Sequence, residues 1–455
     1  MFRRGTRLMK LSFINRQSEL KELDAAAAAG GLVVIFGRRR VGKTRLLARW
    51  LAHRNGLYSQ AIESTREIQL EQVYRDLEPH LTTAVAPKSW AELLEILRLQ
   101  EHGRWVLCLD EFPYLVSSDP SLPSVLQRWL DHSQPDGSLL VLSGSSTRMM
   151  HDMFLNRSAP LYGRARKLLH VEPMSYPAFC GACRLNPADP ESFSRFSIVG
   201  GVPKYWEFVD PKESVVDLAE ALFFGFAPYL DQEPVRILRD EGISGLNALS
   251  LLEAIGRGAE KPSEMAMRLG TAQTNLSRPL QQLLDVSILE RILPFGESVR
   301  STKRVLYRIG DPALRFWFRV YSPHRSRWNT YAADEKRRLI HEHASTVFED
   351  YCRSLYSDAA RYWEGNLEFD LVRAGPRADE GHPIVVSEVK WKRLSNTERG
   401  RILKELEEKW RRSNLSRKFA NVSFEVIDAG ILADLRPELP SRPRPNRRST
   451  EPRLP

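Results

Sequence analysis

Short apolar runs separated by polar and helix-like segments dominate the first 170 residues. The runs at 32–36, 105–109 and 138–142 are followed by a glycine, an aspartate and a serine, and the stretch at 45–51 has helical character. Short apolar runs of this kind are typical of buried strands in a parallel sheet, where helices make the connections. The pattern predicts an α/β unit built on a parallel sheet.

The pattern changes after residue 175. Residues 175–229 resemble helical pieces interrupted by Gly-Gly-Val-Pro at 200–203. Helical spacing then recurs, followed by two strand-like runs: 249–255, 261–269 and 274–284 as helices, 287–293 and 304–309 as strands. Three helices followed by a β-hairpin predict a winged helix.

Composition and charge narrow the class of protein. The 455 residues contain 42% hydrophobic and 27% charged residues, and no apolar run approaches the length of a membrane span. The basic start of the chain lacks the apolar core of a signal peptide, so we expect a cytoplasmic protein without a membrane partner. The net charge of +10 indicates an anionic partner beyond any small ligand, although many basic proteins have none.

The segment after the first apolar run has the form G-x-x-x-x-G-K-T, which is typical of a phosphate-binding loop between a strand and a helix. We expect the whole loop to bind a nucleotide: Gly37, Arg38, Arg39, Arg40, Val41, Gly42, Lys43 and Thr44. Lys43 is expected to reach the outer phosphates and Thr44 to hold Mg²⁺. The three arginine side chains are expected to face solvent or an adjacent domain.

Polar residues at the ends of the next two runs suit phosphate hydrolysis. Asp110 is predicted to bind nucleotide and hold Mg²⁺, and Glu111 to orient the attacking water. Ser143 or Ser145 is the candidate sensor of the γ-phosphate, unless these serines only form a helix-capping turn. Arg164 could stabilise the transferred phosphoryl group in its own or a neighbouring subunit, or be an ordinary surface arginine.

Taken together, these motifs resemble the archaeal-type ATPase family, a branch of the AAA+ and STAND-like P-loop ATPases. The resemblance rests on Phe13 to Leu23, GRRRVGKT, LCLDEFPYL, LSGSS and PLYGRA in that order. It implies that ATP is the nucleotide and that 13–23 is an adenine-side element. The resulting division is a P-loop ATPase domain at 1–174, a helical lid at 175–240, a winged helix at 241–322, an α/β nuclease-like domain at 335–430, and a basic, disordered tail at 431–455.

The C-terminal region is similar to a restriction-endonuclease-like core. The pattern is an acid in a helix, Glu349, an acid in a strand, Asp370, and E-x-K in the next strand, Glu388 and Lys390. A spacing of two places Glu388 and Lys390 on one face of a strand. The resemblance implies that the three acids hold Mg²⁺ and that Lys390 activates water, unless the domain has lost cleavage.

The predicted third helix of the winged helix contains Gln273, Asn275, Ser277, Arg278 and Gln282, and Lys303 and Arg304 fall in its wing. Such side chains suit DNA contact, although winged helices also serve as packing modules. The leading hypothesis is therefore an ATPase that couples its nucleotide state to DNA binding and to Mg²⁺-dependent cleavage, with oligomerisation left open. The alternative is an ATP-gated DNA- or protein-binding regulator with an inactive nuclease-like domain.

Overall fold

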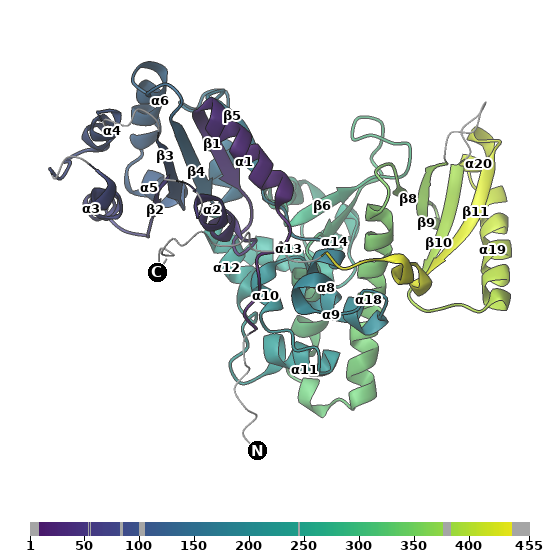
Figure 1. Cartoon of the computed structure of the whole chain (residues 1–455). Helices are drawn as coiled ribbons and strands as arrows, with labels where there is room; N and C mark the ends of the chain where they lie inside the picture. The colour runs from purple at the N-terminus through teal and green to yellow at the C-terminus, as the bar shows by residue number, and fades with distance from the viewer. Residues whose placement is uncertain are drawn as a thin grey trace.

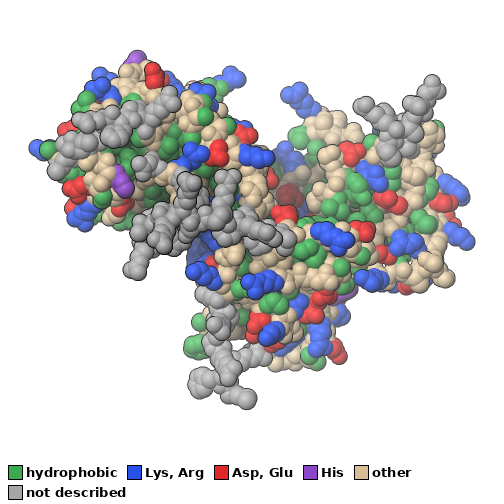
Figure 2. Space-filling model, viewed as in Figure 1, with side chains coloured by type: hydrophobic (Ala, Val, Ile, Leu, Met, Phe, Trp, Pro, Cys, Tyr) green, Lys and Arg blue, Asp and Glu red, His purple; other side chains and the backbone are tan. Residues whose placement is uncertain are grey.

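The computed structural model describes residues 9–52, 54, 56–81, 85–99, 105–243, 246–375 and 384–438. Two sheets lie at opposite ends of the molecule, and a largely helical region lies between them (Figure 1). On the face shown in Figure 2, basic side chains are interspersed with acidic ones. None of the described helices combines the length and apolar character that crossing a bilayer requires.

The N-terminal sheet has five parallel strands in the order β2-β3-β4-β1-β5. Its strands are β1 (Gly31–Phe36), β2 (Gly56–Gln60), β3 (Val106–Asp110), β4 (Leu139–Gly144) and β5 (Ala165–His170). Every residue of β4 is buried, as expected for a strand covered on both faces. The carboxyl ends of β1, β3 and β4 bring the phosphate loop, the acidic pair and the serine cluster to one edge of the sheet.

Helices cover both faces of this sheet. They are α1 (Gln17–Ala29), α2 (Lys43–Leu51), α3 (Arg66–Leu77), the 3₁₀ helix η1 (Glu78–His80), α4 (Trp90–Arg98), α5 (Phe112–Ser118), α6 (Leu122–His132) and α7 (Thr147–Phe154). Val33 and Ile35 of β1 pack with residues of α1 and α2, whereas Leu32 and Val34 pack with residues of α3 to α7. The alternation along β1 therefore divides the core into two layers.

The middle of the chain is helical apart from one hairpin. Its first elements are α8 (Tyr176–Cys183), α9 (Pro190–Val199), α10 (Pro203–Trp206), α11 (Val215–Ala219), the π-helix η2 (Glu220–Phe224) and α12 (Glu233–Asp240). Then follow α13 (Leu246–Gly256), α14 (Pro262–Leu269), η3 (Gln273–Leu276), α15 (Ser277–Asp285) and the antiparallel strands β6 (Leu289–Ile292) and β7 (Leu306–Ile309). Three helices and a hairpin thus occur in the order expected, and their assignment as a winged helix stays a prediction.

Four short helices connect the hairpin to the C-terminal region: α16 (Pro312–Phe316), the π-helix η4 (Trp317–Tyr321), α17 (Ser322–His324) and the 3₁₀ helix η5 (Trp328–Thr330). One hydrophobic cluster extends from α8 through these helices to Phe348 and Trp391. The middle and C-terminal parts of the chain therefore share a core across the predicted boundaries.

A four-stranded mixed sheet, ordered β11-β10-β9-β8, forms the C-terminal region. Its elements are α18 (Ala333–Ser354), β8 (Ala360–Glu364), β9 (Leu367–Ala374), β10 (Ile384–Lys390), α19 (Asn396–Arg411), α20 (Leu415–Lys418), β11 (Val422–Asp428) and the 3₁₀ helix η6 (Ala429–Asp434). Only the β10–β11 pair is parallel. The parallel P-loop sheet followed by a mixed α/β region confirms the predicted fold class.

The predicted disordered tail differs from the structure at its start. Leu432 is fully buried, and the Glu438 amide donates to the Pro177 carbonyl at 3.1 Å. Residues 431–438 therefore pack against α8. Their apolar side chains anchor them, and the basic composition of the tail does not reveal this. The rest of the predicted tail, 439–455, lies outside the described residues.

Candidate nucleotide site and acidic cluster

The phosphate loop leaves β1 through Gly37 and enters α2 at Lys43. Gly37 has φ of 150°, and a Cβ at this position would lie 2.4 Å from the Val171 carbonyl oxygen. Only glycine fits such a conformation and such a close approach. Arg40 and Gly42 also have positive φ, of 71° and 101°, which gives the loop the curled backbone that phosphate binding needs.

Lys43 lies folded onto its own loop. Its side chain is buried, with the residue 5% exposed, and Nζ donates to the carbonyls of Gly37 at 2.8 Å and Arg38 at 3.3 Å. Burial lowers the pKa of Lys43, because the charged amine has lost water. The amine is therefore held beside the phosphate position by two carbonyl oxygens that a phosphate can replace.

A cavity of about 240 Å³ lies over the start of α2. Its walls come from the loop and from α10: Arg40, Gly42, Lys43, Thr44, Arg45 and Glu111 on one side, Pro203, Lys204 and Glu207 on the other. The Gly-Gly-Val-Pro segment thus brings α10 over the loop. Residues 11–14 line a small adjoining space with Gly42 and Arg45, and the adenine-side role expected for residues 13–23 stays a prediction.

Thr44 and Asp110 lie together as a magnesium site requires. The Thr44 hydroxyl donates to Asp110 Oδ2 at 2.6 Å, and the Tyr58 hydroxyl donates to the same oxygen at 3.1 Å. Hydroxyl and carboxylate oxygens are ligand types that Mg²⁺ prefers. The predicted pair therefore fits the ion, and Tyr58 is a third polar group that the sequence did not indicate.

Glu111 and Ser145 are brought into direct contact. The Ser145 hydroxyl donates to Glu111 Oε2 at 2.7 Å, and the Ser145 amide is 3.3 Å from the same oxygen. Ser143 is fully buried, and its hydroxyl has no hydrogen-bond partner among the described residues. In this structure Ser145 positions the predicted catalytic carboxylate, and its role towards phosphate stays a prediction.

All three loop arginines form ion pairs with acids far along the chain, and Arg40 also lines the cavity. The pairs are Arg38–Asp311 (2.7 Å), Arg39–Asp240 (2.8 Å) and Arg40–Glu233 (2.6 Å). The sequence analysis expected these side chains to face either solvent or an adjacent domain. All three contact the adjacent helical region, and Arg39 is also 42% exposed to solvent. Arg38 and Arg40 are only 16% and 17% exposed, so at least these two pairs are substantially removed from water.

Glu241 makes a further link that the sequence analysis missed. Its carboxylate accepts hydrogen bonds from the amides of Thr147 and Arg148, both at 3.1 Å, and from the Ser146 hydroxyl at 3.3 Å. It therefore caps α7, which begins directly after the serine cluster. Burial raises the pKa of Glu241 despite these hydrogen bonds.

Arg164 is engaged elsewhere on the surface. Its Nε and Nη2 donate to the two oxygens of Asp131 at 2.9 and 2.8 Å, and Nη1 donates to the Pro160 and Tyr162 carbonyls. None of its bonds to described residues involves the phosphate loop. The structure therefore does not bring Arg164 to its own nucleotide site, and action across a subunit interface stays a prediction.

The predicted acids of the C-terminal region converge between α18 and two strands. Asp370 of β9 and Glu388 of β10 lie directly beyond the last pair of their antiparallel ladder, Asp370 before Leu371 and Glu388 after Ser387. Asp370 accepts a hydrogen bond from the Val389 amide at 2.9 Å, and Glu388 pairs with Lys390 at 2.7 Å and with Lys409 at 3.3 Å. Lys409, on α19, was not predicted.

The ionisation of these groups shows that they interact. Burial and the Asp370 charge raise the pKa of Glu349 to about 7. Burial and Glu388 raise the pKa of Asp370 to about 6. Burial opposes the charge of Lys390, but Glu388 outweighs that effect and raises the pKa of this lysine. A cation would relieve the repulsion among the acids, so their chemistry fits Mg²⁺.

The acidic side chains of the cluster are not arranged as a formed metal site, although their chemistry suits a cation. Among the described residues, no group of three or more histidine, cysteine, aspartate or glutamate side chains is assembled as a metal site. Both oxygens of Glu388 are occupied by lysines. Metal binding by Glu349, Asp370 and Glu388 would therefore require side-chain movement.

The polar residues predicted for DNA contact lie on η3 and α15. Gln273, Asn275, Ser277 and Arg278 are exposed, as is Lys303 between the two strands of the hairpin. Arg304 instead pairs with Glu297 and donates to the Trp363 carbonyl at 2.8 Å. The hairpin is therefore attached to β8 of the C-terminal region.

Two family descriptions match separate parts of this chain. Residues 13–207 match an ATPase domain found predominantly in Archaea, and residues 317–402 match archaeal and bacterial proteins of unknown function. An uncharacterised protein of Methanocaldococcus jannaschii is 26% identical over 434 residues, covering 89% of this chain and 92% of that protein. A Walker-type ATPase of Pyrococcus abyssi shares the fold, with 19% identity and a TM-score of 0.51 over 68% of this chain and 96% of that one.

Proposed function

We propose that the protein hydrolyses ATP and transmits its nucleotide state to the C-terminal half, because residues 13–207 match an ATPase domain found predominantly in Archaea. The observation that carries the second part is the set of three ion pairs from the phosphate loop. Arg38, Arg39 and Arg40 form ion pairs with Asp311, Asp240 and Glu233. A change in the conformation of the loop would therefore displace contacts of α12 and of the start of α16.

Each site residue has a distinct task in this proposal. Lys43 leaves the two loop carbonyls and contacts the outer phosphates, while Thr44 and Asp110 hold Mg²⁺. The metal supplies charge neutralisation at the phosphates. Glu111 orients the attacking water, and Ser145 fixes the carboxylate of Glu111.

Replacing Lys43 tests the nucleotide site. Lys43→Ala should abolish ATP binding, measured by titration with a fluorescent ATP analogue, because the amine is the only cation on the loop that is turned towards its carbonyls. Lys88→Ala removes an exposed lysine of the same domain and should bind as the wild type does. Tight ATP binding by the Lys43 variant would refute the assignment.

We further propose DNA as the partner of the helical middle region. The exposed residues of η3 and α15 and the net charge of +10 support this choice. The rival proposal is a regulator that binds DNA or protein and has an inactive C-terminal domain. The proposal requires an oligomer only if Arg164 takes part in hydrolysis, because Arg164 would then act on the nucleotide of a neighbouring subunit.

A second candidate function is Mg²⁺-dependent nucleic-acid cleavage. The convergence of Glu349, Asp370, Glu388 and Lys390 supports it, because shared negative charge and one lysine suit phosphodiester hydrolysis. Asp370→Ala and Lys390→Ala should lose cleavage of labelled DNA in Mg²⁺, whereas Lys392→Ala, an exposed neighbour, should retain it. DNA binding without cleavage in the wild type would favour the regulator.

A further inference from the structure

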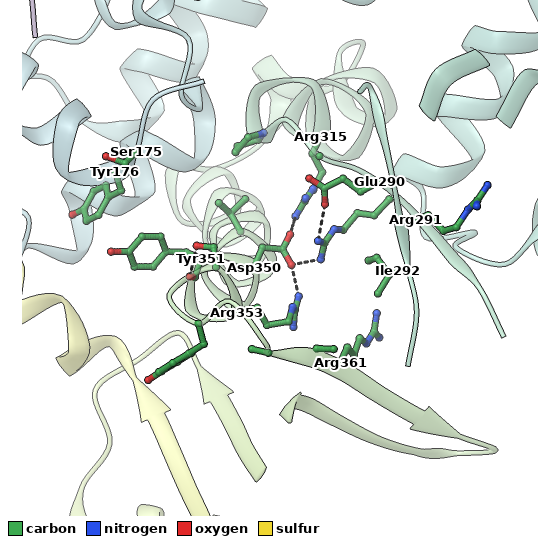
Figure 3. Close-up of a pocket in the computed structure, with 18 of the residues that line it drawn as sticks. Ser175, Tyr176, Glu290, Arg291, Ile292, Arg315, Asp350, Tyr351, Arg353 and Arg361 are labelled. Carbon is green, nitrogen blue, oxygen red and sulfur yellow. Dashed lines mark hydrogen bonds and ion pairs between the residues drawn. The ribbon is translucent and has the colours of Figure 1, made fainter. Parts of the chain in front are cut away.

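A second, larger cavity of about 670 Å³ lies away from the phosphate loop. This open cavity is lined by residues of the β6–β7 hairpin, α8, α9, α16, α18 and β8, and Figure 3 shows 18 of its lining residues. Its volume falls in the range of small-molecule sites, about 300–1,000 Å³. Neither the nucleotide proposal nor the nuclease proposal uses this cavity.

Asp350 stands at the centre of the cavity wall with three arginines around it. Its carboxylate pairs with Arg308, with Arg315 at 2.6 Å and with Arg353, as the dashed lines in Figure 3 show. Burial alone would raise the pKa of Asp350, but the three arginines outweigh burial and lower it. One ionised carboxylate therefore holds three guanidinium groups in fixed positions.

The arginines of this cavity retain unused donors. The Nε groups of Arg291 and Arg308 are buried and have no hydrogen-bond partner among the described residues. Arg291 also forms no ion pair with any described residue, and its one side-chain hydrogen bond is to Gln281 at 3.3 Å. Glu290, which pairs with Arg308 at 3.0 Å, is 52% exposed and free to be displaced.

Aromatic side chains form another part of the wall. Tyr176 and Tyr351 lie on the side of the cavity opposite Arg291, and Figure 3 shows Asp350 and Arg353 between the two groups. Fixed guanidinium groups bind phosphate through paired, charge-assisted hydrogen bonds. Tyr176 is only 1% exposed and packs against Phe193, so the partly exposed ring of Tyr351 is the one on which a base can stack. From this combination we propose that the cavity binds a nucleotide-sized ligand through a phosphate group.

The cavity lies next to the acidic cluster of the C-terminal region. Arg353 pairs with Asp350 and also donates to the backbone carbonyl of Asp370 at 2.8 Å. Asp350 is the neighbour of Glu349 on α18, so the cavity adjoins the acidic cluster. The phosphate can belong to a free mononucleotide or to the terminal nucleotide of a strand, and both present the same chemistry to the arginines.

The experiment measures binding to the full chain with the phosphate loop saturated by a non-hydrolysable ATP analogue. The probes are AMP and a labelled, cleavage-resistant phosphorothioate oligonucleotide with a phosphate at its 5′ end, at its 3′ end or at neither. We expect binding of AMP, or a preference for one phosphorylated end, of roughly tenfold over the unphosphorylated probe. AMP binding assigns a free nucleotide, and preference for an end assigns a strand.

Three variants separate this site from general basic attraction. Arg291→Ala should remove the phosphate-dependent binding. Glu290→Gln should strengthen this binding, because the neutral side chain no longer forms an ion pair with Arg308. Arg300→Ala removes an exposed charge from the same hairpin outside the cavity and should leave the preference unchanged. Gain of binding in Glu290→Gln cannot result from misfolding.

Two results would overturn the proposal. The first is that neither AMP nor any terminal phosphate binds better than the unphosphorylated probe. The second is that Arg300→Ala and Arg291→Ala weaken phosphate-dependent binding equally. The outcome is independent of ATP hydrolysis, so a failed Lys43 test would not decide it.

Discussion

Removing Arg40 should loosen the start of α12, although this helix begins 193 residues farther along the chain. Glu233, the first residue of α12, is 5% exposed, and its Oε2 lies 2.6 Å from Arg40 Nη1. Its other oxygen accepts a hydrogen bond from the Tyr205 hydroxyl at 2.5 Å. Arg40→Ala would leave this carboxylate buried without its closest cation.

The structure sets the size of the effect. Loss of one partner from a fully buried ion pair costs about 3–5 kcal/mol. Arg40 is partly exposed, and both Tyr205 and Arg236, at 3.5 Å, still contact Glu233 after the change. We therefore expect about 2 kcal/mol, which corresponds to roughly a 30-fold increase in local opening of α12. Adding Glu233→Gln removes the stranded charge, so the double variant should lose less than the two single variants together.

Hydrogen exchange of α12 amides, followed by mass spectrometry, measures local opening directly. Arg54→Ala is the matched control, because it breaks an exposed ion pair with Asp24 inside the N-terminal region. Its effect on α12 should be undetectable. Unchanged exchange of α12 in Arg40→Ala, or strictly additive effects in the double variant, would refute the view that the loop arginine holds this helix.

Further predictions concern hydrolysis and pH. Glu111→Gln should retain ATP binding but lose turnover by about 100-fold or more in a phosphate-release assay, since the variant cannot accept a proton. Ser145→Ala should lower kcat by roughly tenfold with little change in KM, because Glu111 loses its hydrogen bond; a higher kcat would show that Ser145 restrains the carboxylate instead. The pKa of Glu349 is about 7 in the fold against an ordinary value of 4.5, so the fold favours the protonated form. Its contribution to stability should be complete below about pH 4.5 and lost as the pH rises through 7, with a total of about 3 kcal/mol. Denaturation curves should show a weaker pH dependence for Glu349→Gln and an unchanged one for Glu342→Gln, an exposed residue of the same helix.

Local patterns predicted the elements that carry the nucleotide site. The apolar run at 32–36 became β1 at Gly31–Phe36, and the run at 138–142 became β4 at Leu139–Gly144. The strand, the phosphate loop and the helix are adjacent in sequence here. The spacing of their residues is therefore enough to predict which of them lie together. The P-loop fold was predicted correctly for this reason. The family expectation came from the resemblance of the motifs, and residues 13–207 match an ATPase domain found predominantly in Archaea.

Contacts between distant charges could not be predicted in the same way. Arg38 and Asp311 are 273 residues apart, and no periodicity links an arginine to its acid. Asp350 shows a second limit. It lies beside the predicted Glu349, but neighbours on a helix point about 100° apart, and Asp350 therefore meets three arginines while Glu349 faces Asp370.

The two charge networks meet at α16. Asp311, which pairs with Arg38 of the phosphate loop, caps α16 by accepting a hydrogen bond from the Leu314 amide at 2.8 Å. Arg315 of the same helix pairs with Asp350 of α18. Because Asp350 also pairs with Arg353, which donates to the Asp370 carbonyl, charged contacts and one short helix connect the loop to the acidic cluster. A nucleotide-dependent movement of Arg38 would thus act on α16 and reach Asp350 through direct contacts, which is the physical basis of the proposed coupling between the two ends of the molecule.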